Sequence, residues 1–150
     1  MARCEGTAHS MTRKEKVELL RRVKLFSGLG QKALGEVADL MTEITFPANR
    51  YIVRQGQVGT GFYLITAGSA RVVRGDRTLN TLGPGDFFGE LSVLDQSPRI
   101  AHVVTVEPTS VLALASWDFT KLLEGNAKVT LVLLKEVVAR LRGASQSPVH

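Results

Sequence analysis

The run GPGDFFGELSVLDQSPRIAHVVTV, residues 83–106, holds the residues on which both the fold and the function of this chain depend. It opens with a Gly-Pro-Gly-Asp turn at 83–86 and closes with an apolar segment after Arg99. Between them stand two phenylalanines, then Gly89, where the absence of a side chain lets other backbone approach closely. The segment 90–94 can form a single helical turn. The run therefore predicts a tight loop held between two strands.

The residue types of this loop are compatible with an anionic ligand. A helix beginning at Glu90 would present unpaired N–H groups and the positive end of its dipole, which together attract anions. Glu90 there is either a dipole partner or an acceptor for hydroxyl groups, and Arg99 supplies a planar fork suited to phosphate. With the apolar wall beside them, these groups fit a phosphorylated sugar that carries a flat base. On spacing alone, a surface ion pair between Glu90 and Arg99 is the alternative.

Outward from this run, between Thr45 and Trp117, apolar residues recur mostly at every second position. Eight of the 14 glycines fall within residues 56–89, so turns are frequent and strands short. A parallel sheet would need crossover helices, for which there is no room. The pattern predicts an antiparallel jelly roll. The expected strands are residues 43–46, 51–54, 61–67, 69–74, 77–82, 86–88, 100–106 and 110–116.

Helical spacing returns at both ends of this region. The predicted fold is therefore mainly β, an eight-stranded antiparallel jelly-roll barrel over 43–116 with N-terminal helices in 12–42 and C-terminal helices in 117–142. At 150 residues the chain has the length of about one domain, which we place at 12–143. We expect 1–11 to be a flexible leader and 144–150 a tail.

The last predicted helix, 126–142, is apolar most of the way round. A helix of this kind is normally buried on more than one side. We expect one side to lie on the barrel and the other to meet a ligand, a second subunit or another domain. Trp117, at the start of the preceding helix, is expected to be a core anchor.

Composition and residue content argue against several other classes of protein. The net charge of +5 invites a nucleic-acid role, but the basic residues of 13–24 lie on one face of an amphipathic helix, so no direct nucleic-acid binding is expected. No apolar run approaches the ~18 residues of a membrane span. One cysteine, Cys4, favours a reducing cytoplasm. Two of the three histidines stand near the ends, so neither a metal site nor a metal-dependent enzyme is expected. No serine has a histidine and an acid arranged for catalysis, and we predict no catalytic residues.

Phe88-Gly89-Glu90-Leu91-Ser92-Val93-Leu94, followed by Pro98-Arg99-Ile100-Ala101, resembles the phosphate-binding cassette of the cyclic nucleotide-binding domain family. This is the type of domain found in catabolite activator proteins and protein kinase A regulatory subunits. The family pattern is FGE-L/I-A-L, a variable loop, then PR-A/T/S-A. Upstream, Gln55-Gly56, Gly59, residues 62–65 (FYLI) and Gly68 resemble the glycine-punctuated strands of the family, and Leu25-Phe26 with Leu29 resembles its helical lead-in.

The resemblance implies a role for each of the following residues. Arg99 would clamp the cyclic phosphate, and Glu90, with the Gly89 backbone beside it, would accept a hydrogen bond from the ribose 2′-hydroxyl. Backbone N–H groups would help to hold the phosphate near Leu91, Ser92, Ile100 and Ala101. The base pocket would be lined by Val72, Leu79, Phe88 and Val103.

Two residues depart from the family pattern. Ile100 follows the arginine where alanine, serine or threonine is usual, and threonine there favours guanine. Because isoleucine has no hydroxyl, cyclic AMP is the expected ligand and cyclic GMP the alternative. His102 stands where threonine or serine is common. We expect a half-exposed strand histidine, with its role left open.

The function implied is a non-catalytic, cofactor-free regulatory sensor of cyclic AMP, whose binding biases the terminal helices. Its expected partners are the nucleotide and, through 126–142, a second copy or an effector. Two alternatives stay open. One is a protein-interaction jelly-roll domain without a physiological nucleotide, and the other is the sensor part of a larger transcription regulator, channel or enzyme.

Overall fold

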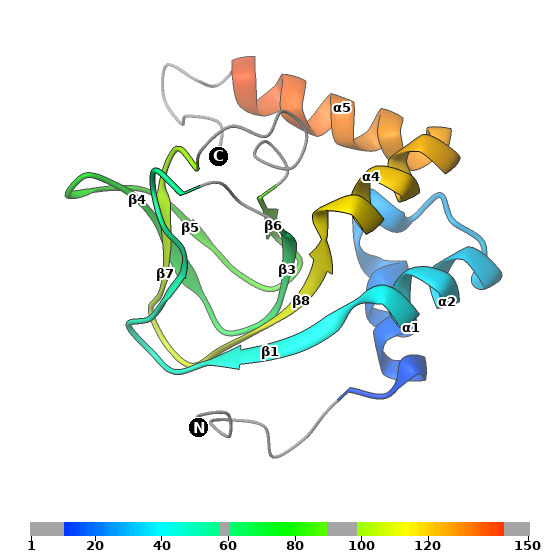
Figure 1. Cartoon of the computed structure of the whole chain (residues 1–150), viewed down its shortest axis with the longest axis horizontal. Coiled ribbons are helices and arrows are strands. Elements are labelled where there is room, and N and C mark those ends of the chain that lie inside the picture. Colours follow the sequence, from blue (N-terminus) through cyan, green and yellow to red (C-terminus); the bar gives the residue numbers. More distant parts are fainter. Residues whose placement is uncertain (1–10, 58–60, 90–98, 143–150) are drawn as a thin grey trace.

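The computed structural model describes residues 11–57, 61–89 and 99–142, and the predicted mainly β fold with flanking helices is confirmed (Figure 1). Two four-stranded antiparallel sheets form the barrel, with strand orders β1-β8-β3-β6 and β2-β7-β4-β5. The strands are β1 (Thr42–Phe46), β2 (Tyr51–Val53), β3 (Gly61–Ala67), β4 (Ala70–Arg74), β5 (Arg77–Leu82), β6 (Phe87–Phe88), β7 (His102–Thr105) and β8 (Thr109–Ala115). All eight lie within one or two residues of the predicted positions.

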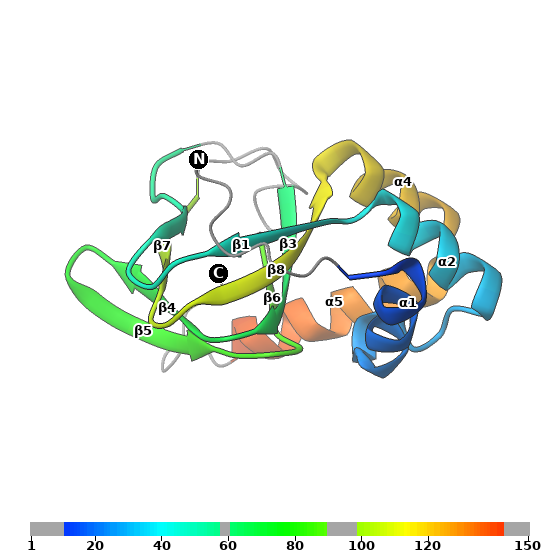
Figure 2. The same cartoon turned by 90° about the horizontal axis from the view of Figure 1, so that it is seen from below.

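The sheet containing β3 and β8 is covered on both faces, which explains why those strands are apolar nearly throughout. One face carries Ile65 and Val111 into the barrel interior, where they meet residues of the other sheet such as Val72. The opposite face carries residues such as Leu64 and Leu112 into a second cluster formed with the helices. This sheet therefore lies between the apolar interior of the barrel and the helical layer, as Figure 2 shows.

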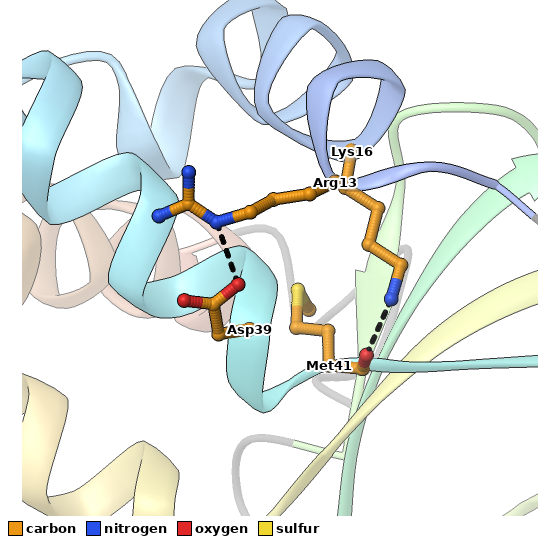
Figure 3. A network of polar contacts seen from close by, with 4 residues as sticks. All are labelled: Arg13, Lys16, Asp39 and Met41. Atoms are coloured by element: carbon orange, nitrogen blue, oxygen red, sulfur yellow. Dashed lines mark hydrogen bonds and ion pairs between the residues drawn. The ribbon is translucent and has the colours of Figure 1, made fainter.

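The N-terminal helices are α1 (Arg13–Arg22) and α2 (Gln31–Leu40), with a short 3₁₀ turn, η1 (Lys24–Phe26), between them. Thr12 and Glu15 form a capping box that fixes the start of α1. Arg13 Nε donates to Asp39 Oδ1 at 2.6 Å, and Lys16 Nζ donates to the carbonyl of Met41 at 2.9 Å (Figure 3). These contacts tie α1 to the end of α2.

The C-terminal helices are α4 (Ser116–Gly125) and α5 (Ala127–Arg142). Phe119 of α4 is fully buried and stacks on Phe62 of β3, with ring centroids 4.3 Å apart. The expectation for Trp117 is wrong, because its side chain is 65% exposed. At about 3.6 residues per turn, two residues along a helix is more than half a turn, so burial of Phe119 directs Trp117 to solvent.

Helix α5 packs through Val129 and Leu133, both buried in the helical cluster. Its other side is uncovered, with Leu134 56% and Leu141 63% exposed. The predicted surplus of apolar surface on this helix is therefore present. None of the helices in the described ranges is long and apolar enough to cross a membrane.

Candidate functional site

A hollow with about 280 Å³ of empty space, open to solvent, is lined by residues of β2, β4, β6 and β7, by Gly89 and by residues 99–101. Three valines on neighbouring strands form its apolar wall. Val72 of β4 and Val53 of β2 each pair in register with Val103 of β7. Because alternate residues of a strand point to the same face, these side chains lie together on the inner surface. The full lining is Val53, Val72, Phe88, Gly89, Arg99, Ile100, Ala101 and Val103.

Arg99 brings a positive charge to this apolar hollow. Its side chain is mostly withdrawn from water, at 8% exposure for the residue, and Nη2 donates to the carbonyl oxygen of Gly61 at 2.9 Å. Its backbone is held as well, because its N–H donates to Gln57 O at 2.7 Å and its carbonyl accepts from Gly56 N–H at 2.8 Å. A guanidinium keeps its proton in proteins, so the hollow has a fixed cation on its wall.

Gly89 lies directly beside that guanidinium, and only glycine fits there. Its φ is +98°, in the region that side chains disfavour. A Cβ atom at this position would stand 2.6 Å from Gly61 O and 2.8 Å from Arg99 Nη1. The absence of a side chain at residue 89 therefore lets β3, the guanidinium and the Gly89 backbone meet at one point.

Most of the residues singled out from sequence come together in this hollow. Those that line it are Val72, Phe88, Gly89, Arg99, Ile100, Ala101 and Val103. Leu79 packs against the apolar cluster of the barrel interior, which includes Val72 and Val103, but it does not line the hollow. Glu90, Leu91, Ser92 and the expected helical turn at 90–94 lie outside the described residues.

Sequence reasoning missed two contributors to the site. Val53 was placed on a predicted strand, and its period-two spacing was a signal that it faces inward. The carbonyl oxygen of Gly61 left no such signal, because a backbone acceptor is the same for every residue type. What fixes the position of the Arg99 side chain is therefore invisible in the sequence.

The arrangement can hold a ligand that is anionic at one end and flat and apolar at the other. The anion would meet the Arg99 guanidinium, and the apolar group would lie against the valines and Phe88. Across the three described ranges, no group of three or more His, Cys, Asp or Glu side chains is placed to hold a metal ion.

Comparison with known proteins gives this geometry its context. A family model described as "Cyclic nucleotide-binding domain" matches residues 43–126. The cyclic AMP receptor protein of Thermus thermophilus is 35% identical over 125 residues, which are 80% of this chain and 58% of that protein. A cGMP-dependent protein kinase of Caenorhabditis briggsae is 32% identical over 114 residues, 71% of this chain and 15% of the kinase.

The fold is shared with solved structures of the same kind. The regulatory domain of Toxoplasma gondii PKA, co-crystallised with cAMP, superimposes with a TM-score of 0.75 at 29% identity. That superposition covers 83% of this chain and 49% of the solved one. The chain thus corresponds to one part of each of these longer proteins.

Proposed function

The chain belongs to the family of cyclic nucleotide-binding domains, and we propose that it binds cyclic AMP as a non-catalytic regulatory module. The observation that carries this proposal is that one hollow combines a buried arginine, an apolar wall and Gly89, a position where any side chain would clash. The cyclic phosphate, with one negative charge, would pair with Arg99. The adenine would lie against Val72, Phe88 and Val103.

The remaining contacts fall on the loop that follows Gly89. In this proposal Glu90 accepts a hydrogen bond from the ribose 2′-hydroxyl. Backbone N–H groups at 91, 92, 100 and 101 complete the phosphate contacts. Such donors suit a phosphate because each adds a hydrogen bond to a charged acceptor.

Ile100 supports adenine over guanine. It lies at the rim of the hollow, 38% exposed, and its side chain has no hydrogen-bonding group. Guanine would bring an exocyclic amino group that needs an acceptor or water, and burying it unpaired costs about 1–3 kcal/mol. We therefore expect cyclic GMP to be the weaker ligand.

Strand β6 offers a route from the hollow to α5. Phe88 faces the barrel, whereas Phe87 joins the helical cluster. Arg140 of α5 lies over the Phe87 ring, its guanidinium carbon 4.9 Å from the centroid, and Nη2 reaches the Phe87 carbonyl at 3.4 Å. A shift of Phe88 and Gly89 on nucleotide binding would therefore displace Phe87 and change its contacts with Arg140.

The contact between α5 and the barrel leaves room for movement. A hollow with about 440 Å³ of empty space, open to solvent, lies between η1, the turn before β6 and the C-terminal half of α5. Structural elements that move in regulation typically have few buried apolar contacts with the rest of the protein. We propose that nucleotide binding changes the position of α5, and that this movement is the regulatory output.

The uncovered stripe of α5 supports pairing with a second copy of the chain. Its exposed apolar residues are Leu131, Leu134, Val138 and Leu141. Their spacing of three, four and three residues matches the seam of a two-stranded coiled coil. We propose a homodimer through α5 in the cytoplasm. An effector on the same stripe is the competing occupant.

Thermal unfolding of the full chain with added nucleotide tests the proposal. A ligand that binds only the folded state stabilises it by about 2.7 kcal/mol at a concentration 100 times its Kd. Cyclic AMP should raise Tm most, cyclic GMP less, and linear 5′-AMP not at all. If neither cyclic nucleotide raises Tm, the alternative of an interaction domain without a nucleotide stands instead.

A further inference from the structure

His102 begins β7 immediately beyond the hollow but does not face it. Its neighbours Ala101 and Val103 both line the hollow, whereas His102 is half-buried on the opposite face of the strand. Successive side chains of a strand point to opposite faces. A nucleotide in the hollow would therefore be separated from the imidazole by the sheet itself.

The imidazole is nevertheless engaged in a specific contact. Nδ1 accepts a hydrogen bond from the backbone N–H of Gln55, with 3.0 Å between the two nitrogens. The ring also meets Tyr51 of β2 edge-on, at 4.9 Å between centroids. The guanidinium of Arg54 lies over the ring of the same tyrosine, with its carbon 4.3 Å from the centroid. These contacts hold the ring with Nδ1 toward the turn at 54–57.

The turn at 54–57 also holds the backbone of Arg99, the residue proposed to bind the phosphate. Gly56 N–H donates to Arg99 O at 2.8 Å, and Arg99 N–H donates to Gln57 O at 2.7 Å. The Gln55 side chain adds a second anchor, because Oε1 accepts from Gly75 N–H at 3.2 Å. The turn is thus fixed to His102 and to the β4–β5 hairpin on one side and to Arg99 on the other.

We propose that His102 is a positioning residue for the cyclic nucleotide site. Its Nδ1 holds the turn at 54–57, and the turn holds the Arg99 backbone so that the guanidinium stays beside Gly89. This inference rests on the proposed function of the hollow. Only an imidazole without a proton on Nδ1 can accept this hydrogen bond.

Two substitutions distinguish the contribution of the His102 hydrogen-bond acceptor from that of its aromatic ring. His102→Phe keeps an aromatic ring against Tyr51 but removes the acceptor. His102→Asn places Oδ1 at the same number of bonds from the backbone as Nδ1, so it keeps a hydrogen-bond acceptor at that place. Thr78→Val is the control, because residue 78 lies on the same sheet in β5 and has no hydrogen bond to the turn among those described.

Cyclic AMP affinity of the full chain would be measured by calorimetric titration. His102→Phe should bind about three- to tenfold more weakly than the native protein, the range expected for one lost hydrogen bond. His102→Asn and Thr78→Val should stay near the native value.

Native affinity in a folded His102→Phe protein, or equal losses in the Asn and Phe variants, would overturn the role of His102. Amide exchange gives an independent readout, because Gln55 N–H should exchange faster in His102→Phe and at the native rate in His102→Asn. If the native protein bound no cyclic nucleotide, the proposed function would fail. Exchange at Gln55 would then still show whether His102 anchors the turn.

Discussion

Replacing Gly89 with alanine should damage the site and the fold together. The residue has φ +98°, and a conformation of that kind costs a side-chain-bearing residue about 1–3 kcal/mol. The new Cβ would also stand 2.6 Å from Gly61 O, which belongs to a paired strand and cannot retreat, and 2.8 Å from Arg99 Nη1. Overpacking of this kind adds about 1–3 kcal/mol.

Gly85→Ala is a matched control for this substitution. Gly85 has nearly the same φ, +93°, but a Cβ there would meet no described atom within 4 Å. Both variants therefore carry the backbone strain, and only Gly89→Ala carries the clash. Urea unfolding should place the stability of Gly89→Ala about 1–3 kcal/mol below that of Gly85→Ala.

The same pair of variants should separate in nucleotide binding. The guanidinium can escape the new Cβ only by moving away from Gly89, which would loosen a charged hydrogen bond worth about 1.5–3 kcal/mol. Calorimetric titration should show a loss of roughly 10- to 100-fold in cyclic AMP affinity for Gly89→Ala and little change for Gly85→Ala. Equal stability and equal affinity of the two variants would refute the reasoning.

Three further predictions concern the ribose contact, the base preference and α5. Glu90→Ala should lower cyclic AMP affinity by ~10- to 100-fold and should no longer distinguish cyclic AMP from its 2′-deoxy analogue; undiminished discrimination in the variant would contradict the role of Glu90. Calorimetric titration of the native protein should show an affinity for cyclic AMP roughly tenfold or more above that for cyclic GMP. Ile100→Thr should reduce this affinity ratio. A native preference for cyclic GMP would show the base assignment to be wrong. Leu134→Glu should convert a dimer to a monomer in sedimentation experiments while Lys135→Glu, next to the stripe, should not; equal behaviour of the two variants would argue against pairing through α5.

The jelly roll could be predicted from the sequence because its signals are local. Period-two spacing and closely placed glycines mark each strand and turn without knowledge of its partners. Strand β6 illustrates this: two adjacent phenylalanines after a Gly-Pro-Gly-Asp turn were enough to place it. Arg99 and Gly89 could be singled out for the same reason, because both belong to one contiguous motif.

The contacts that position the site depend on residues distant in sequence, and no local pattern reveals them. Arg99 is held by the carbonyl of Gly61 and by the turn at 54–57, and His102 reaches that turn from another strand. The error at Trp117 has a related cause. Both Trp117 and Phe119 are large and apolar, and only packing against Phe62 decides which of them is buried.

The claim that Arg99 carries the nucleotide phosphate is tested most directly by titrating cyclic AMP into the native protein and into Arg99→Ala. Far-ultraviolet circular dichroism and Tm would establish that the variant is folded, since the substitution also removes the hydrogen bond to Gly61. Removing one partner of a desolvated charge pair costs about 3–5 kcal/mol, so the native protein should bind at least ~100-fold more tightly than the variant. A folded Arg99→Ala protein with native affinity would show that the phosphate does not bind at Arg99.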